Sequence, residues 1–194
     1  MPENITILSE ELLSNNWGTL TKVTYKTTTP TGEIVTGVRE VYNRGNGATI
    51  LLYNKEKGTV ILTRQVRIPT YYNGNPNGRL IETCAGLLDN ESPEENIRRE
   101  TEEETGYIIG EVTRIMEVYM SPGSVTETIH FFAAPYNDAH KNGDGGGLEE
   151  EQEHIEVIEL PFTKAMEMVK TGEIKDAKTV MLLQWAKIEG IFGL

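Results

Sequence analysis

The sequence predicts an α/β or α+β domain preceded by a small domain of β-strands. Extended segments rich in β-branched and aromatic residues recur along the chain, and a few helical segments interrupt them only after residue 90. The first forty or so residues contain extended segments alone. A chain of 194 residues is long enough to bury a core of ordinary size. We therefore expect a β domain over residues 1–44 and a larger domain over residues 45–194.

The N-terminal half is expected to consist mainly of paired strands. Residues 17–28, "WGTLTKVTYKTT", and residues 33–42, "EIVTGVREVY", flank a short polar turn and predict a hairpin. Residues 47–54 and 59–68 predict a second pair across "NKEKG". Residues 78–86, "GRLIETCAG", form a further strand candidate that leads into an acidic helix.

The C-terminal half adds strands and two more helices. Strands are expected at 111–121, 126–136 and 155–162, and helices at 163–171 and 178–190. Residues 137–148, "NDAHKNGDGGGL", have no apolar periodicity and contain four glycines, so they are expected to form a mobile surface loop, either a lid or a linker.

Composition narrows the function. The net charge of −12 disfavours binding to nucleic acids, and no apolar run approaches the length of a membrane span. The N-terminus lacks the features of a secretion signal, and the single cysteine, Cys84, permits no internal disulfide. Cys84 and His130 are interpreted as ordinary strand residues. We expect a cytoplasmic protein.

Residues 92–106 predict a short helix with strong boundary signals. Ser92 can cap it, Pro93 suits its first turn, Glu95 can complete a capping box, and Gly106 can end it. Ile97 is the only large aliphatic residue between these ends, so a broad apolar face cannot hold this helix in place.

The same helix carries carboxylates on one face. Glu100, Glu103 and Glu104 follow an i, i+3, i+4 spacing, which brings like charges together and destabilises an isolated helix. Carboxylate oxygens are the ligands that Mg²⁺, Mn²⁺ and Ca²⁺ prefer. Arg99 is close enough in sequence to orient one of the acids. A solvated acidic surface is the alternative interpretation.

The pattern Glu91-x7-Arg99-Glu100-Thr101-x-Glu103-Glu104-x-Gly106-Tyr107 resembles the signature of the Nudix hydrolases, which cleave nucleoside diphosphates linked to another moiety. The family signature begins with Gly, five residues and Glu, whereas only four residues separate Gly86 from Glu91. Alignment from Glu91 places Ala85 at the glycine position, and alignment from Gly86 places Ser92 at the glutamate position.

Motifs outside the signature extend the resemblance to nearly the whole chain. "RGNGATILLYN", "LTRQVR", "ETCAGLLDN", "YMSPGSVTE" and "ELPF" are similar to the branch of the family that acts on GDP-mannose, close to the ADP-ribose pyrophosphatases. This resemblance implies an α/β/α sandwich with a mixed sheet, and an N-terminal β domain that helps to build a homodimer. It also implies a Mg²⁺ ion, which Mn²⁺ can replace, and hydrolysis of GDP-mannose to GMP and mannose 1-phosphate.

The resemblance implies a set of site residues. Glu100, Glu104 and the carbonyl of Ala85 are expected to bind the metal, with Glu103 as an additional ligand or a water-holding group, and Arg99 assists them. Arg39 and Arg67 are candidates for binding the diphosphate, or else for surface salt bridges, and Trp17 is a candidate for stacking on the base, or else a buried anchor. The remaining expected substrate contacts are Val38, Glu40, Gly86, Leu87, Glu127 and Lys178.

A general base is expected outside the helix, because metal-bound glutamates accept protons poorly. Residues 145–157, "GGGLEEEQEHIEV", offer Glu149, Glu150, Glu151 and Glu153 directly after the glycines. Glu153 is the first choice, as base and additional metal ligand, since related pyrophosphatases carry an acid two residues before the Ile of the next strand. Glu151 is the second choice.

Three other functions compete with GDP-mannose hydrolysis. ADP-ribose hydrolysis to AMP and ribose 5-phosphate differs only in the base pocket. A non-catalytic sensor of nucleotide sugars has little need for repelling carboxylates. A calcium-binding structural helix lacks the loop of an EF-hand.

Overall fold

The computed structural model describes residues 5–148, 150 and 153–193. The chain forms two compact units. The first contains the chain up to Asn46 together with residues 118–128, and the second contains residues 47–117 and the chain from Ile129 onwards. Residues 118–128 comprise the end of one strand of the larger sheet, the connection after it and the first residue of the next strand, and they group with the N-terminal strands.

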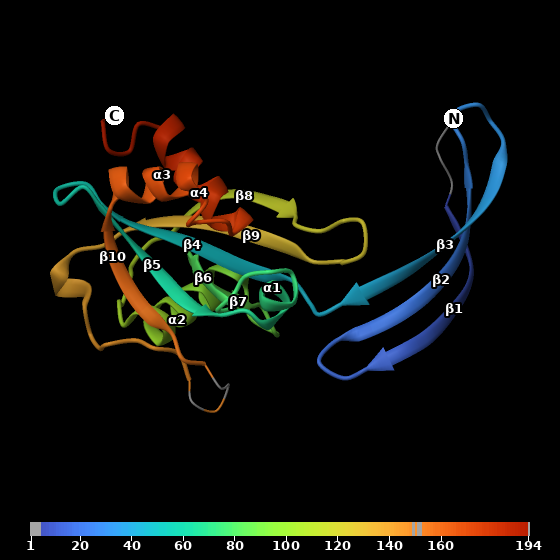
Figure 1. Cartoon of the computed structure of the whole chain (residues 1–194), viewed down its shortest axis with the longest axis horizontal. Coiled ribbons are helices and arrows are strands. Elements are labelled where there is room, and N and C mark those ends of the chain that lie inside the picture. Colours follow the sequence, from blue (N-terminus) through green and yellow to red (C-terminus); the bar gives the residue numbers. More distant parts are fainter. Residues whose placement is uncertain (1–4, 149, 151–152, 194) are drawn as a thin grey trace. The chain divides into compact units, whose positions relative to one another are not determined.

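The first unit is a three-stranded antiparallel sheet of long strands (Figure 1). Its strands are β1 (Thr6–Asn15), β2 (Thr19–Thr28) and β3 (Ile34–Asn43), in that order. The predicted hairpin is confirmed as β2 and β3, in register from Thr19↔Asn43 to Thr28↔Ile34. Strand β1 was not predicted, because nine of its ten residues are exposed and it lacks the apolar alternation that marks a half-buried strand.

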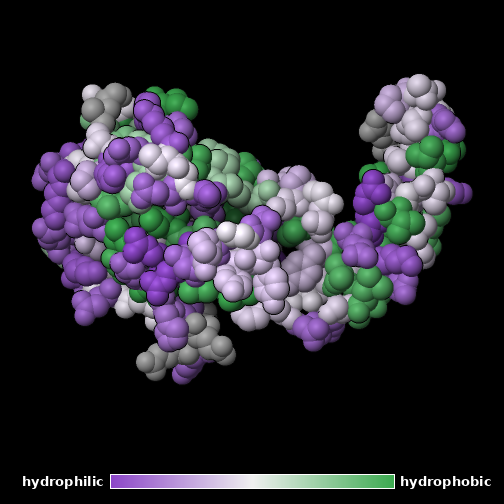
Figure 2. Space-filling view, viewed as in Figure 1, coloured by the Kyte–Doolittle hydropathy of each residue, from purple (hydrophilic) through white to green (hydrophobic). Residues whose placement is uncertain are grey.

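Large hydrophobic side chains lie on the surface of this sheet. Figure 2 shows hydrophobic residues exposed over the N-terminal strands. The exposed side chains on β1 and β3 are Ile7, Leu8, Leu12, Leu13, Ile34 and Val38. Large apolar side chains that gather on a surface are typical of sites of association.

The second unit contains a seven-stranded mixed sheet. Its strands are β4 (Gly47–Asn54), β5 (Thr59–Val66), β6 (Arg79–Glu82), β7 (Cys84–Leu87), β8 (Thr113–Tyr119), β9 (Thr128–Pro135) and β10 (Glu156–Pro161). The main order is β10-β5-β4-β9-β8, with β6 paired to β5 and β7 paired to β4. Strands β4 and β9 run parallel, whereas β4 pairs antiparallel with β5 and β7.

Helices cover both faces of this sheet. Figure 1 shows α2 (Pro93–Thr105) on one face, and α3 (Phe162–Thr171) and α4 (Ala177–Ile188) on the other. Ala48, Ile50 and Leu52 of the buried strand β4 share a core with Ile97 of α2. Successive side chains of a strand point to opposite faces of the sheet. A strand that is covered on both faces, as β4 is, therefore has a continuous run of apolar residues in its sequence. The expected α/β/α sandwich with a mixed sheet is confirmed.

Helix α2 has the boundaries that its sequence predicts. The Ser92 hydroxyl accepts a hydrogen bond from the Glu95 amide, and the Glu95 carboxylate accepts one from the Ser92 amide. Gly106 ends the helix with φ 73°, in the left-handed region that glycine adopts without strain. The capping box and the glycine stop are therefore confirmed.

Polar tertiary contacts hold α2 in place of a broad apolar face. Asn96 Nδ2 donates to the Leu87 carbonyl at 2.6 Å, and Arg98 Nε donates to the Gly110 carbonyl at 3.0 Å. Ile97 is fully buried beneath these contacts. The helix is thus fixed by a single apolar anchor and by hydrogen bonds to its neighbours.

The glycine-rich segment 137–148 differs from the mobile loop that was expected. Its backbone amides cap the C-terminal end of α2, where Gly146 N donates to the Glu104 carbonyl at 2.9 Å and Gly147 N donates to the Glu103 carbonyl at 3.1 Å. A Cβ on Gly145 would lie 2.4 Å from the Glu104 carbonyl oxygen. The glycines therefore permit close backbone docking.

Two short helical segments were also not predicted, α1 (Ile68–Tyr72) and the 3-10 helix η1 (Asp138–His140). Each is too short to show an apolar periodicity. The single strand predicted over residues 78–86 was wrong, because the chain divides there into β6 and β7, which pair with β5 and β4 respectively. The other predicted strands and helices are present. None of the helices described in the structure is long and apolar enough to cross a membrane.

Candidate active site

The candidate site forms where β7 meets α2. Strand β7 pairs with β4 through Ala85↔Thr49 and Gly86↔Ala48. A Cβ on Gly86 would lie 2.1 Å from Glu100 Cδ, so only glycine leaves room for that carboxylate. The expected site residues Ala85, Gly86 and Leu87 therefore line the helix face that carries the acids.

Arg99 gathers three carboxylates around one guanidinium group. Its Nε donates to Glu91 at 3.0 Å, its Nη1 donates to Glu103 at 2.7 Å, and its Nη2 lies 3.0 Å from Glu100. Although partial burial lowers the pKa of Arg99, these carboxylates raise it above its ordinary value. The Glu91 pair favours the alignment in which Glu91 holds the signature glutamate and Ala85 the signature glycine, since Ser92 is occupied as the helix cap.

Glu104 differs from its neighbours because it is buried and forms no ion pair with any of the described residues. The residue is 1 % exposed, and neither carboxylate oxygen has a hydrogen-bond partner among the residues described. Burial raises the pKa of its carboxyl to about 8, although the Cys84 thiol beside it opposes the shift and the charges of Glu153 and Glu100 add to it. An isolated buried carboxylate is costly, so this side chain is either protonated or bound to a cation from outside the chain.

The pKa of the Glu100 carboxyl is also raised, by a smaller amount than that of Glu104. Partial burial raises the pKa of its carboxyl to about 7, with Arg99 opposing the shift and the charges of Glu103 and Glu153 supporting it. Glu100, Glu104 and Glu153 thus interact electrostatically, although Glu153 comes from the segment before β10 and the other two from α2.

Glu153 reaches this cluster from a narrow loop. Ile155 N donates to the Gly146 carbonyl at 3.0 Å, and Glu153 N donates to the Leu148 carbonyl at 3.2 Å. A Cβ on Gly147 would lie 2.4 Å from Glu153 Oε2, so the carboxylate packs directly over this glycine. Glu150 is exposed, and Glu149 and Glu151 lie outside the described residues.

The donor set fits a divalent cation. Its chemistry is that of carboxylate oxygens, which hard cations such as Mg²⁺ prefer, and the buried Glu104 oxygens lack a partner. Among the described residues, no three acidic, histidine or cysteine side chains already converge on one point. Arg99 instead occupies Glu100 and Glu103, as expected for carboxylates that would otherwise repel one another.

Two expected substrate residues meet at a second buried acid. Arg67 Nε donates to Glu82 Oε2 at 2.8 Å, and Lys178 Nζ donates to Glu82 Oε1 at 2.6 Å and to Asp176 at 2.8 Å. The surface salt bridge considered for Arg67 is therefore an ion pair with an interior carboxylate. Glu82 was not predicted as a site residue, although an acid among Ile81, Thr83 and Cys84 in a buried strand is itself an unusual signal.

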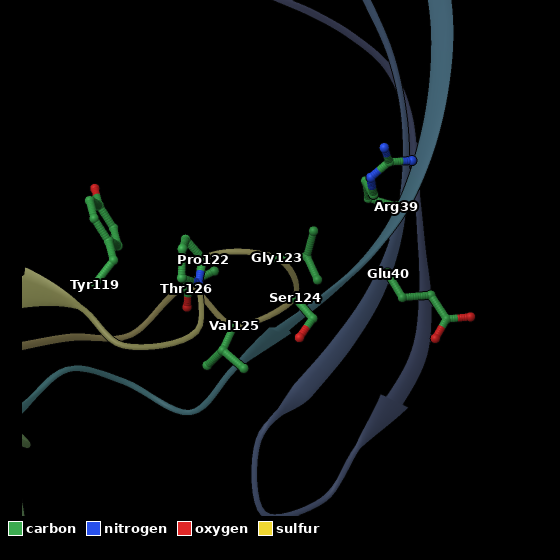
Figure 3. A pocket seen from close by; sticks show the side chains of 9 residues that line it. Arg39, Glu40, Tyr119, Pro122, Gly123, Ser124, Val125 and Thr126 are labelled. Carbon is green, nitrogen blue, oxygen red and sulfur yellow. The ribbon is translucent and has the colours of Figure 1, made fainter. Parts of the chain in front are cut away.

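The other expected substrate residues belong to the first unit. Trp17 lies in the turn between β1 and β2 and is 83 % exposed, so the buried anchor considered for it is wrong. Arg39 and Glu40 line a cavity of about 630 Å³ together with Val41, Tyr119 and residues 122–126 (Figure 3). The Arg39 guanidinium donates to the Val38 carbonyl at 2.7 Å, and Glu127 lies 3.1 Å from Arg44.

Comparison with known proteins identifies the family. The NUDIX domain model matches residues 43–183, and the model of the GDP-mannose pyrophosphatase NudK N-terminal domain matches residues 4–42. The GDP-mannose pyrophosphatase of Escherichia coli O1:K1 / APEC is 56 % identical over 188 residues, which cover 97 % of each chain. That of Salmonella arizonae is 55 % identical over 193 residues and covers both chains fully.

A solved structure supports the same fold. The crystal structure of an ADP compounds hydrolase superposes with a TM-score of 0.70 at 22 % sequence identity and covers 96 % of both chains. The signature residues on α2, the mixed sheet and the family match over residues 43–183 agree with one another. The chain is therefore a member of the Nudix family of hydrolases.

Proposed function

We propose that this protein hydrolyses the pyrophosphate bond of a nucleotide sugar, with GDP-mannose as its preferred substrate and GMP and mannose 1-phosphate as products. The observation that carries the proposal is Glu104, a carboxylate that is 1 % exposed and has no partner in the described chain. A buried acid of this kind suits a bound cation, and a cation allows an acidic protein to accept an anionic diphosphate. The identity of 55–56 % to GDP-mannose pyrophosphatases over nearly the full chain selects the substrate.

The cation is proposed to be Mg²⁺, with Mn²⁺ as a substitute. Glu100, Glu104 and the carbonyl of Ala85 would hold it, and Glu103 would complete the site. When bound, such an ion polarises a phosphoryl oxygen and lowers the pKa of a coordinated water. Release from Arg99 would let Glu100 and Glu103 turn toward the ion, because the guanidinium can keep Glu91 as its partner.

The chain's own groups supply orientation and proton transfer. Arg67 faces the diphosphate as a fixed positive charge, and Lys178 supports it from α4. Glu153 accepts the proton of the attacking water, whose oxygen joins one phosphorus while the bridging P–O bond breaks. Glu151 is the second candidate for this base. Trp17, Val38, Arg39, Glu40 and Glu127 are proposed to contact the nucleotide, Arg39 and Glu40 from the walls of the cavity in the first unit.

We further propose that the protein is a cytoplasmic homodimer. The exposed apolar residues of β1 and β3 support a second copy as the partner of this sheet, since isolated sheet edges and apolar faces favour association. Light scattering at micromolar concentration should give twice the mass of 21.7 kDa. A particle of 21.7 kDa alone would refute the dimer.

A substrate panel tests the function directly. Sugar nucleotides with different bases and sugars are incubated with the protein, Mg²⁺ and an added phosphatase, and phosphate release is measured. We expect GDP-mannose to give the highest kcat/KM, ADP-ribose a lower one, and chelator to abolish both. Equal and feeble turnover of every member would overturn the substrate assignment. Ligand binding without turnover in Mg²⁺ or Mn²⁺ would instead identify a sensor.

A further inference from the structure

A second buried carboxylate lies at the end of β6, away from the helix signature. Glu82 is 2 % exposed, and its two oxygens accept hydrogen bonds from Arg67 and Lys178, one each. We propose that Glu82 is a positioning residue that holds Arg67 and Lys178 toward the diphosphate of the substrate. This inference rests on the proposed function.

The geometry of Arg67 suits this role. Its bond to Glu82 uses Nε, which leaves the Nη edge of the guanidinium for another anion, and the side chain is 39 % exposed. Its positive charge also reaches Glu104, where it opposes the rise of that carboxyl's pKa. Arg67 is therefore tied to a buried anchor through Nε, and its two Nη groups can pair with a diphosphate.

Lys178 enters the same arrangement from the first turn of α4. Its Nζ donates to Glu82 and to Asp176, so the third donor of the ammonium group can serve a ligand. Although burial lowers the pKa of Lys178, the charges of Glu82 and Asp176 raise it above the ordinary value. The ammonium group stays charged because two acids flank it.

Charges of opposite sign therefore alternate along a chain of ion pairs. Its members, in order, are Asp176, Lys178, Glu82 and Arg67. Without the carboxylate of Glu82, Arg67 and Lys178 would each lose a buried partner, and no negative charge would separate the two cations. Breaking a buried ion pair displaces or destabilises the remaining charge.

The backbone keeps Glu82 rigid. Strand β6 pairs with β5 through Thr63↔Glu82, and Thr63 Oγ1 donates to the Glu82 carbonyl at 3.3 Å. The next amide, Thr83 N, donates to Thr179 Oγ1 of α4 at 2.7 Å. A side chain fixed by the sheet and by α4 can orient its partners within the narrow limits that a site needs.

The test is Glu82→Gln, which keeps the shape of the side chain and removes its charge. We expect KM for GDP-mannose to rise roughly 10- to 100-fold, as for losses of supporting partners, with a smaller change in kcat. Asn54→Ala is the matched control. It removes a buried amide that accepts hydrogen bonds from Glu56 N and Lys57 N in the turn between β4 and β5, away from the site, and should lower Tm by roughly 3–10 °C with an unchanged KM.

A double-mutant cycle shows whether Glu82 acts through Arg67. If it does, Arg67→Ala raises KM and adding Glu82→Gln raises it little further. Additive effects, a wild-type KM in Glu82→Gln, or an equal KM rise in Asn54→Ala would each overturn the inference. If Glu82→Gln does not fold, Arg67→Lys replaces it as the test. A lysine side chain has a single nitrogen, so it cannot bond Glu82 and also present the two Nη groups of an arginine to the diphosphate. A wild-type KM in that variant would also overturn it.

The wild-type protein separates this inference from the proposed function. If the wild type hydrolyses none of the sugar nucleotides, the proposed function fails and the site has been misassigned. If the wild type is active while Glu82→Gln keeps its KM, the function stands and only the role of Glu82 fails.

Discussion

Glu82 and Glu104 are buried to nearly the same extent, but their surroundings differ. Glu82 is 2 % exposed and is paired with two cations from its own chain, whereas Glu104 is 1 % exposed and has no hydrogen-bond partner among the described residues. A buried charge needs compensation in either case. The chain supplies it for Glu82, and an ion from solution is proposed to supply it for Glu104. The contrast distinguishes a positioning carboxylate from a ligand-binding one.

The largest effect is expected from Glu104→Gln. Removal of this carboxylate weakens the proposed metal site, and the several kcal/mol of charge stabilisation that a metal gives correspond to a loss of roughly 10³-fold in kcat/KM. Steady-state kinetics over a range of Mg²⁺ concentrations measure it. Activity within a few-fold of wild type would show that Glu104 is not a metal ligand.

The next effect tests the base. Glu153→Gln should lower kcat by roughly 10²-fold or more while KM changes little, because a general base acts in the chemical step. The exposed Glu150→Gln serves as the control and should retain wild-type kcat. If Glu153→Gln keeps full turnover and Glu151→Gln loses it, the base is Glu151. If both keep it, neither acid is the base.

The stability of the metal-stripped protein should depend on pH through Glu104. Its folded-state pKa of about 8 lies above the ordinary value of 4.5, so between these values the folded state binds more protons than the unfolded state. Stability is therefore present at low pH and is lost as pH rises toward 8, with Glu100 acting in the same direction.

Urea unfolding in chelator measures this loss. We expect the free energy of unfolding to fall by about 2 kcal/mol between pH 6 and pH 8. Added Mg²⁺ should restore it, since an ion that binds only the folded state stabilises that state. Glu104→Gln should reduce the slope, and an unchanged slope in this variant would assign the effect to other groups.

The smallest effect concerns a residue that supports the fold alone. Ser92→Ala removes the cap of α2 and should lower the free energy of unfolding by about 1 kcal/mol, with kcat and KM unchanged. Thermal unfolding and steady-state kinetics on the same sample measure both. A loss of turnover would mean that the cap also orients the carboxylates on the helix.

The sequence by itself determined the local elements of this protein. The start of α2 at Ser92 and its end at Gly106 depend on side chains that bond to adjacent backbone groups, so a short stretch contains all the information needed. The hairpin of β2 and β3 and the i, i+4 spacing of Glu100 and Glu104 are likewise local. The family signature is made of such local spacings, which is why it could be recognised.

Only the tertiary structure decided which charges are compensated. Glu82 and Lys178 are 96 positions apart, and their 2.6 Å bond exists because β6 and α4 pack together. The docking of Gly146 on the end of α2 is also non-local, as is the approach of Glu153 to Glu104. Electrostatic compensation in an interior depends on burial and on distances in space, and a linear sequence specifies neither until the chain has folded.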